Sequence, residues 1–348
     1  FTSAYYGLRG DKIFEEFEDR FLRKNVEGAL IRQVLSPINW IPQMSPAFGR
    51  GDVAAEYYSK HIFDGATFAD LKRPGSPVVV INATDLATGM RFSFTEAYFD
   101  LLCADLDQYL LARAVTASSA VPVLFTPITV KSYAGTCGFE PPAWLKEAEK
   151  DERGSTRKAE ARGLSCYMDD KKRPWIHLVD GGIADNLGLR SFYTTFSLQG
   201  DPRQTFRELG HPDVRHVLII SVNSFAHKKE NWPLERAAPG LAETIGAISS
   251  DQIGRYNYDT IDIVRYSFEY WTKKISTPQH PVTFDFVEVS FNVVDDADQR
   301  QALNDIGTNF HLEDDELDLL ISSAGKVLRK SPDFRSFLKH TDGRFQQP

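Results

Sequence analysis

The sequence predicts an α/β fold, built as one large domain or as a domain with an appendage. Short apolar runs bounded by turn residues, such as 176–179 and 216–222, are typical of buried strands. Between these runs, apolar residues recur every three or four positions, which is typical of amphipathic helices. The 348 residues are 42% hydrophobic and 12% aromatic, so the chain is long and apolar enough to bury a sizeable core.

The first hundred residues contain a predicted helix, a loop and a hairpin. Residues 36–52 hold three prolines and little periodicity, which predicts a loop. The run 77–86 is typical of a strand, and 90–99 is predicted to be its hairpin partner. The helix is predicted to end near residue 24, because these apolar positions follow helical spacing: Ile13, Phe14, Phe17, Phe21 and Leu22.

The remaining elements follow in alternation. A helix begins near Leu106 and ends at Pro122. Residues 141–172 are strongly charged, which predicts a surface insertion that is helical in its first half. The other predicted elements are a helix at 190–196, strands at 216–224 and 283–291, a long helix at 241–271 with a candidate break near Asn257, and helical structure over 298–338.

The strongest candidate for a catalytic residue is Asp180, within the run WIHLVDGGIADNLGLR at 175–190. A predicted apolar strand delivers this carboxylate directly into a turn made by Gly181 and Gly182, which lets the backbone bend sharply and approach a ligand. In open α/β sheets, ligands bind beyond the carboxyl ends of strands, where Asp180 stands. The alternative is an ordinary Asp-Gly turn with no catalytic role.

The segment around Asp180 resembles the second signature of the patatin-like phospholipases, in which an aspartate in a DG[GA] turn is the partner of a nucleophilic serine. Three further segments share the resemblance, namely 1–11, 81–89 and 113–127, so it extends from the first residue to about 223. It implies a three-layer α/β/α sandwich with a central, mostly parallel sheet. We therefore expect a patatin-like domain over 1–223, carrying the charged insertion, and an α/β continuation with long helices over 224–348.

The resemblance implies a lipid acyl hydrolase with a Ser-Asp dyad, which needs no metal or cofactor and acts on ester-linked lipids. No GxSxG nucleophile turn occurs in the sequence, and Phe1 onward resembles the helix that follows that turn. We therefore expect the N-terminal strand and nucleophile elbow to be missing, and the chain alone to be inactive. Ser3, Ser118 and Ser119 lack the flanking glycines of an elbow, so none is assigned as the nucleophile.

Other polar residues near Asp180 have simpler interpretations. His177 stands three residues earlier in the strand, so its side chain is expected to point to the opposite face, as a packed or hydrogen-bonded core histidine. Asn186 and Gly188 are expected to support the turn in DNLGL. Asp85 is expected to cap or brace a loop near the site.

Composition excludes some partners. The formal net charge of −8 argues against nucleic-acid binding and removes any global attraction to anionic lipid. Peripheral membrane binding would then rest on an apolar or aromatic patch, or on a local basic cluster such as 171–173. The acidic runs at 313–318 and 295–298 are interpreted as helix N-termini rather than cation sites, because the pattern of a calcium loop is absent.

Three cysteines allow at most one internal disulfide. Cys137 and Cys166 bracket the charged insertion, and a bridge between them is expected if the protein is exported. Free thiols in a cytosolic protein are the alternative. Cys103 is interpreted as a small core residue. The resemblance to bacterial secreted or envelope proteins favours an envelope or extracellular, membrane-associated location.

Two other functions are alternatives to a patatin-like hydrolase with a Ser-Asp dyad. The protein could have lost its serine and serve as a lipid-binding or interaction module of the same fold. It could also be an unrelated α/β hydrolase with a histidine-containing triad, in which Asp180 is the acid member. That second alternative requires a late functional histidine, but no motif supports His280, His311 or His340.

Overall fold

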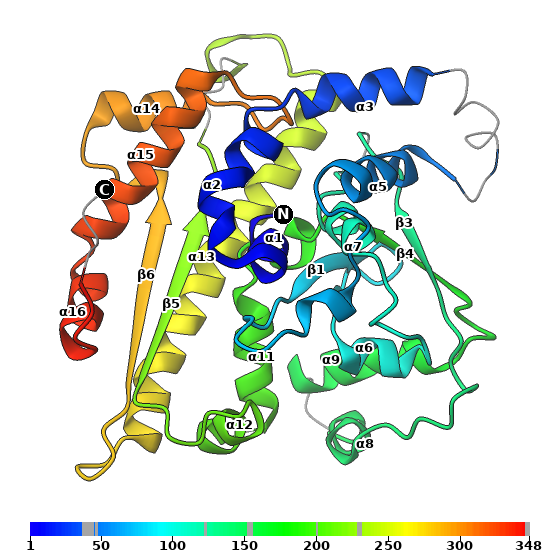
Figure 1. The fold of residues 1–348 in the computed structure, drawn as a ribbon, viewed down its shortest axis with the longest axis vertical. Helices are drawn as coiled ribbons and strands as arrows, with labels where there is room; N and C mark the ends of the chain where they lie inside the picture. Colours follow the sequence, from blue (N-terminus) through cyan, green and yellow to red (C-terminus); the bar gives the residue numbers. More distant parts are fainter. Residues whose placement is uncertain are drawn as a thin grey trace. The chain divides into compact units, whose positions relative to one another are not determined.

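The computed structural model describes residues 1–36, 45, 48–121, 124–151, 156–199, 201–227 and 232–344. The chain forms two compact units (Figure 1). The first contains residues 1–185 and 310–312, and the second contains 186–309 and 313–348. These units reflect packing, whereas the expected boundary after residue 223 concerns the family domain and stays a prediction.

The first unit contains a four-stranded sheet in the order β2-β1-β4-β3, in which each described pair is antiparallel. The strands are β1 (Ile81–Asp85), β2 (Arg91–Phe94), β3 (Ile128–Lys131) and β4 (Trp175–Val179). The predicted hairpin is confirmed as β1 and β2, although the second strand ends earlier than expected because α6 begins at Glu96. The expected mostly parallel central sheet is not confirmed, since β4 runs opposite to both of its neighbours.

Helices cover this sheet. α5 packs on α7, and α7 packs on β1 and β4. The core includes fully buried aromatic rings such as Tyr58, Phe92 and Phe99. The helices are α1 (Thr2–Arg9), α2 (Ile13–Phe17), α3 (Val26–Leu35), α5 (Arg50–His61), α6 (Glu96–Leu101), α7 (Leu111–Ser118), α8 (Ala143–Glu149), α9 (Thr156–Ser165) and α10 (Gly182–Asp185), with shorter helical turns η1 (Gly10–Lys12), η2 (Glu18–Leu22), η4 (Phe68–Leu71) and η5 (Cys166–Met168).

The N-terminal helix is interrupted, in contrast to the single helix predicted. Gly10 has a φ of 60°, so α1 ends there and a 3-10 turn precedes α2. Ile13 and Phe17, one helical turn apart, are buried. Phe14 lies on a different face of the helix and is 81% exposed, so the prediction that it belongs to the apolar face was wrong.

The charged segment is more deeply packed than predicted. Its first half is helical, as expected, and α9 makes most of the second half helical as well. Leu145 and Ala148 of α8 and Ala161 of α9 are buried in the core of the first unit. The segment therefore contributes apolar contacts to the core and is not only a surface insertion.

The disulfide joins Cys103 to Cys137, with Cα atoms 5.5 Å apart, while Cys166 is an exposed free thiol. The expected Cys137–Cys166 bridge and the interpretation of Cys103 as a core thiol were both wrong. The reason is a long-range contact after β3. The Tyr133 amide donates to the Leu102 carbonyl (2.8 Å), which brings the following loop against the end of α6.

The second unit contains two parallel strands, β5 (His216–Asn223) and β6 (Thr283–Ser290), paired along their full lengths. α13 (Leu241–Ile275) lies along β6 and continues through the buried Asn257 without the candidate break (Figure 1). Asp296 caps α14, and Glu313 and Glu316 form a capping box on α15, which confirms the interpretation of the acidic runs. The other elements are α11 (Leu189–Gln199), α12 (Pro202–Glu208), α14 (Ala297–Asp305), α15 (Asp314–Lys330), α16 (Pro332–His340), η6 (Trp232–Leu234) and η7 (Phe291–Val293).

Candidate active site

Asp180 directly follows β4 and is held by the end of α7. Its amide donates to the Ala120 carbonyl (3.0 Å), and the Gly181 amide donates to the Ser118 carbonyl (3.1 Å). Ser118 is the last residue of α7, whose final carbonyls have no partner within the helix, and Ala120 lies just beyond it, so both carbonyls can anchor the turn. The segment 113–127 thus contributes backbone acceptors to the Asp180 turn.

Gly181 is required by the close approach of another strand. A Cβ atom at this position would lie 2.5 Å from the carbonyl oxygen of Asn82 in β1. That oxygen belongs to the backbone of a paired strand and cannot move aside as a flexible side chain would. A glycine therefore allows the turn to pack directly on the sheet.

Thr84 of β1 joins the two ends of the Asp180 turn. Its buried hydroxyl donates to the Asp180 carbonyl (2.7 Å) and accepts from the Ala184 amide (3.1 Å) at the start of α10. The sequence contained no signal for this role, because Thr84 and Asp180 are 96 positions apart. One side chain thus fixes the Asp180 carbonyl and the backbone of the turn that follows it.

The Asp180 carboxylate is half-buried, and one of its oxygens is already bound. Oδ1 accepts from the Gly182 amide at 2.7 Å. Burial raises the pKa of Asp180 above its ordinary value, although the hydrogen bond from Gly182 acts in the opposite direction. No described residue donates a hydrogen bond to Oδ2. The carboxylate thus combines raised basicity with one oxygen able to accept a proton.

His177 belongs to a different face of β4 from the buried side chains. Ile176 and Leu178 are buried, whereas His177 is exposed and its Nδ1 contacts the Thr129 hydroxyl at 3.0 Å. The expectation of a hydrogen bond is confirmed, but the expected core location was wrong. The alternation of a strand turns residue 177 away from the core side of the sheet. The structure gives no hydrogen bond between His177 and Asp180.

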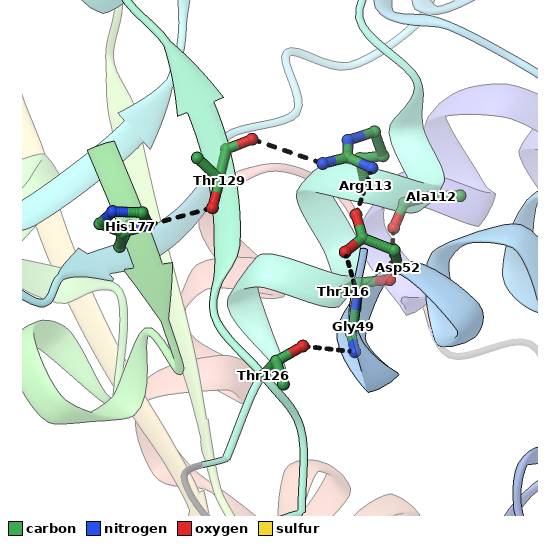
Figure 2. A network of polar contacts seen from close by, with 9 residues as sticks. Gly49, Asp52, Ala112, Arg113, Thr116, Thr126, Thr129 and His177 are labelled. Atoms are coloured by element: carbon green, nitrogen blue, oxygen red, sulfur yellow. Dashed lines mark hydrogen bonds and ion pairs between the residues drawn. The ribbon is translucent and has the colours of Figure 1, made fainter. Parts of the chain in front are cut away.

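A polar network, shown in Figure 2, fixes the position of α7. Arg113 of α7 donates to Asp52 of α5 (2.8 Å) and to the Thr129 carbonyl of β3 (3.4 Å). Asp52 also accepts from the Gly49 amide at 2.9 Å, as the N-terminal cap of α5. These bonds join α5, α7 and β3, and α7 in turn supplies the Ser118 carbonyl to the Asp180 turn. Asp52 was not predicted from the sequence, although Arg113 opens one of the segments that carry the family resemblance.

Asp85, the last residue of β1, braces the loop that follows it, as predicted, because its Oδ1 accepts from the Ala87 amide (3.0 Å). It is fully buried, and its Oδ2 accepts from the Tyr167 hydroxyl (2.9 Å) and from Arg173 (2.6 Å). Burial and the adjacent Asp85 raise the pKa of Tyr167, so its hydroxyl remains a donor. Arg173 is partly buried and forms an ion pair with the buried Asp85, so it is less available than Lys171 and Lys172 for a basic membrane contact.

The other candidate residues are structural in character. The Ser119 hydroxyl donates to the Val115 carbonyl (3.0 Å), which is a helix-terminal contact. Ser3 is exposed on α1. Asn186 lies in the second unit, where its amide donates to Asn257 of α13 (3.4 Å). Gly188 has a φ of 68°, which suits a tight turn before α11.

Among the described residues, no group of three or more His, Cys, Asp or Glu side chains is arranged to hold a metal ion. In the same part of the chain, none of the helices has both the length and the apolar character needed to cross a bilayer.

Comparison with known proteins identifies the family. The model of the family described as Patatin-like phospholipase matches residues 2–193, which include the Asp180 turn and each element that holds it. No curated protein matches the chain significantly. Because the match covers more than half of the sequence, the chain belongs to the patatin-like phospholipase family.

Proposed function

We propose that the protein is a lipid acyl hydrolase in which Asp180 is the base of a Ser-Asp dyad. Membership of a family of lipid hydrolases supports the reaction class. The observation that carries the residue assignment is the Asp180 carboxylate itself, with its raised pKa, its half-buried position and its free Oδ2. An ordinary Asp-Gly turn gains nothing from a desolvated carboxylate, whereas a general base does.

The proposed mechanism is acyl transfer through a serine ester. A hydroxyl is a weak nucleophile at neutral pH and needs a base within hydrogen-bond reach. Asp180 accepts the serine proton as the oxygen attacks the ester carbonyl, and the proton then passes to the departing alcohol. Asp180 next activates water to hydrolyse the acyl-enzyme. The products are a fatty acid and a lysolipid or glycerol derivative.

We propose that the nucleophilic serine and the backbone amides that bind the oxyanion are not among the 348 residues. The supporting observation is the absence of a GxSxG turn from the 348 residues. The hydroxyls of Ser118 and Ser119 lie at the end of a helix rather than in a strand-to-helix elbow. Under this proposal, residues 1–348 alone do not hydrolyse esters.

An envelope or extracellular location and a peripheral membrane contact also belong to the proposal. The Cys103–Cys137 disulfide supports an oxidising compartment. The net charge of −8 disfavours general attraction to anionic lipid, so contact with a membrane would rest on local apolar side chains.

The test uses the polypeptide encoded by the complete reading frame and a fluorophosphonate probe, which reacts covalently with activated serines. Labelling at a serine within an upstream GxSxG turn, lost in Asp180→Asn, supports the dyad. A reading frame with no such serine, or a folded protein that does not label, favours the alternative of an inactive lipid-binding module. Labelling that persists in Asp180→Asn contradicts the assignment of Asp180.

A further inference from the structure

A cavity of about 320 Å³ lies in the first unit between α6, the loop after β3, and helices α8 and α9. We call it the α6–α8 pocket. Three aromatic residues from three different segments line it, namely Tyr98 of α6, Phe139 of the loop and Trp144 of α8. Its other walls are mainly aliphatic, so it presents an apolar and aromatic interior.

Two carboxylates complete the lining, Asp100 of α6 and Glu140 of the loop, and no lysine, arginine or histidine is present. Both carboxylates are exposed, and neither forms an ion pair with a described residue. Four other cavities in the described part of the chain are each lined by at least one arginine or lysine. The α6–α8 pocket thus combines negative charge with aromatic walls.

This combination selects among ligand classes. A fatty acid anion would be repelled by two uncompensated carboxylates. A primary ammonium is strongly hydrated, and an apolar pocket replaces little of that hydration. A quaternary ammonium carries its charge inside a shell of methyl groups, so it can contact aromatic faces through cation–π attraction while carboxylates balance its charge.

The pocket is also held in shape before a ligand arrives. The Cys103–Cys137 disulfide joins the segment after α6 to the loop that carries Phe139 and Glu140. A hydrogen bond from the Tyr133 amide to the Leu102 carbonyl makes a second connection. Two walls of the pocket are therefore linked covalently, which reduces the ordering cost of binding.

We propose that the α6–α8 pocket binds a trimethylammonium group, either on a soluble choline-type compound or on the headgroup of a lipid. The site does not include Asp180 and stands apart from the proposed hydrolase chemistry. It would let the protein recognise a choline-containing ligand whether or not that ligand is hydrolysed.

The first arm of the test measures binding of choline and ethanolamine to the 348-residue chain by saturation-transfer difference NMR. We expect saturable transfer to the choline methyl protons and at least tenfold weaker binding of ethanolamine, because the primary ammonium loses more hydration. Equal binding of the two amines contradicts the proposal.

The second arm uses flotation with vesicles of phosphatidylcholine and of phosphatidylglycerol. Binding to phosphatidylcholine alone identifies a lipid headgroup as the ligand, and binding of free choline without vesicle binding identifies a soluble one. Absence of binding to both choline and phosphatidylcholine vesicles overturns the proposal.

Variants assign the binding to this pocket. The double variant Asp100→Asn and Glu140→Gln changes two exposed side chains, and we expect at least a tenfold loss of affinity. Glu147→Gln removes one exposed carboxylate of α8 that lies outside the pocket, and it serves as the control for the loss of a nearby charge. Trp144→Leu tests the aromatic wall, with unfolding midpoints confirming that it folds. Unchanged affinity in the folded double variant refutes the assignment to this pocket.

Discussion

Replacing Thr84 with valine removes the hydroxyl that joins the two ends of the Asp180 turn, with little change of shape. The Asp180 carbonyl loses its bond from Thr84, and no other described donor replaces it. The Ala184 amide is less affected, because it also donates to the Gly181 carbonyl at 3.2 Å. Both hydrogen bonds of the hydroxyl are therefore lost, but only the Asp180 carbonyl is left without a partner. The expected cost is about 1–3 kcal/mol in the free energy of unfolding, since a partly buried acceptor is left without a partner.

The same change is expected to reduce ester hydrolysis by the polypeptide from the complete reading frame. A small displacement of the carboxylate lowers kcat by roughly ten- to a hundredfold, while KM for a soluble ester changes little. Urea unfolding measures the stability, and steady-state kinetics measures kcat and KM. Thr84→Ser is the matched control, because it keeps the hydroxyl and loses one methyl group. Equal kcat in Thr84→Val, Thr84→Ser and wild type would refute the positioning role.

Three further changes test the geometry of the first unit by urea unfolding. Gly181→Ala places a Cβ atom 2.5 Å from the Asn82 carbonyl oxygen and should lower the free energy of unfolding by about 1–3 kcal/mol. The control is Gly246→Ala, where a Cβ atom meets no other atom within 4 Å, so its effect should be neutral or stabilising. Equal effects of the two changes would contradict the close approach at Gly181. Asp85→Ala removes a buried carboxylate from the partly buried Arg173 and from the buried Tyr167 hydroxyl, and should cost about 3–5 kcal/mol. A loss below about 1 kcal/mol would show that the pair is solvated. Burial raises the folded-state pKa of Asp180, so the folded protein holds that proton more tightly than the unfolded chain, and stability falls as pH rises through the interval above 3.8. Asp180→Asn should therefore stabilise the protein at about pH 7 and have little effect at about pH 3, and a destabilising effect at neutral pH would contradict the assigned direction.

Local patterns allowed much of the site to be predicted. An apolar run followed by glycines identified β4 and the turn that presents Asp180, because strand length, apolar character and glycine are all local signals. The hairpin of β1 and β2 was predicted for the same reason. The family resemblance then gave the carboxylate a proposed role that its spacing alone did not distinguish from an ordinary turn.

Contacts between distant residues account for what was missed. Strand periodicity carries no information on strand direction, so the antiparallel pairing of β4 could not be obtained from it. The Cys103–Cys137 pairing depends on how the loop after β3 meets α6, whereas the predicted pair was chosen because Cys137 and Cys166 bracket the charged insertion. Thr84 likewise becomes important only because the sheet places it beside Asp180.

The most direct test of the central claim compares wild type and Asp180→Asn of the complete polypeptide in hydrolysis of a phospholipid and of a soluble ester. Asparagine keeps an oxygen that can accept from the Gly182 amide, so the turn is retained while the base is removed. We expect a folded variant that is at least as stable as wild type at neutral pH and lacks measurable turnover of both substrates. Wild-type turnover in the folded variant would contradict the proposal that Asp180 is the base.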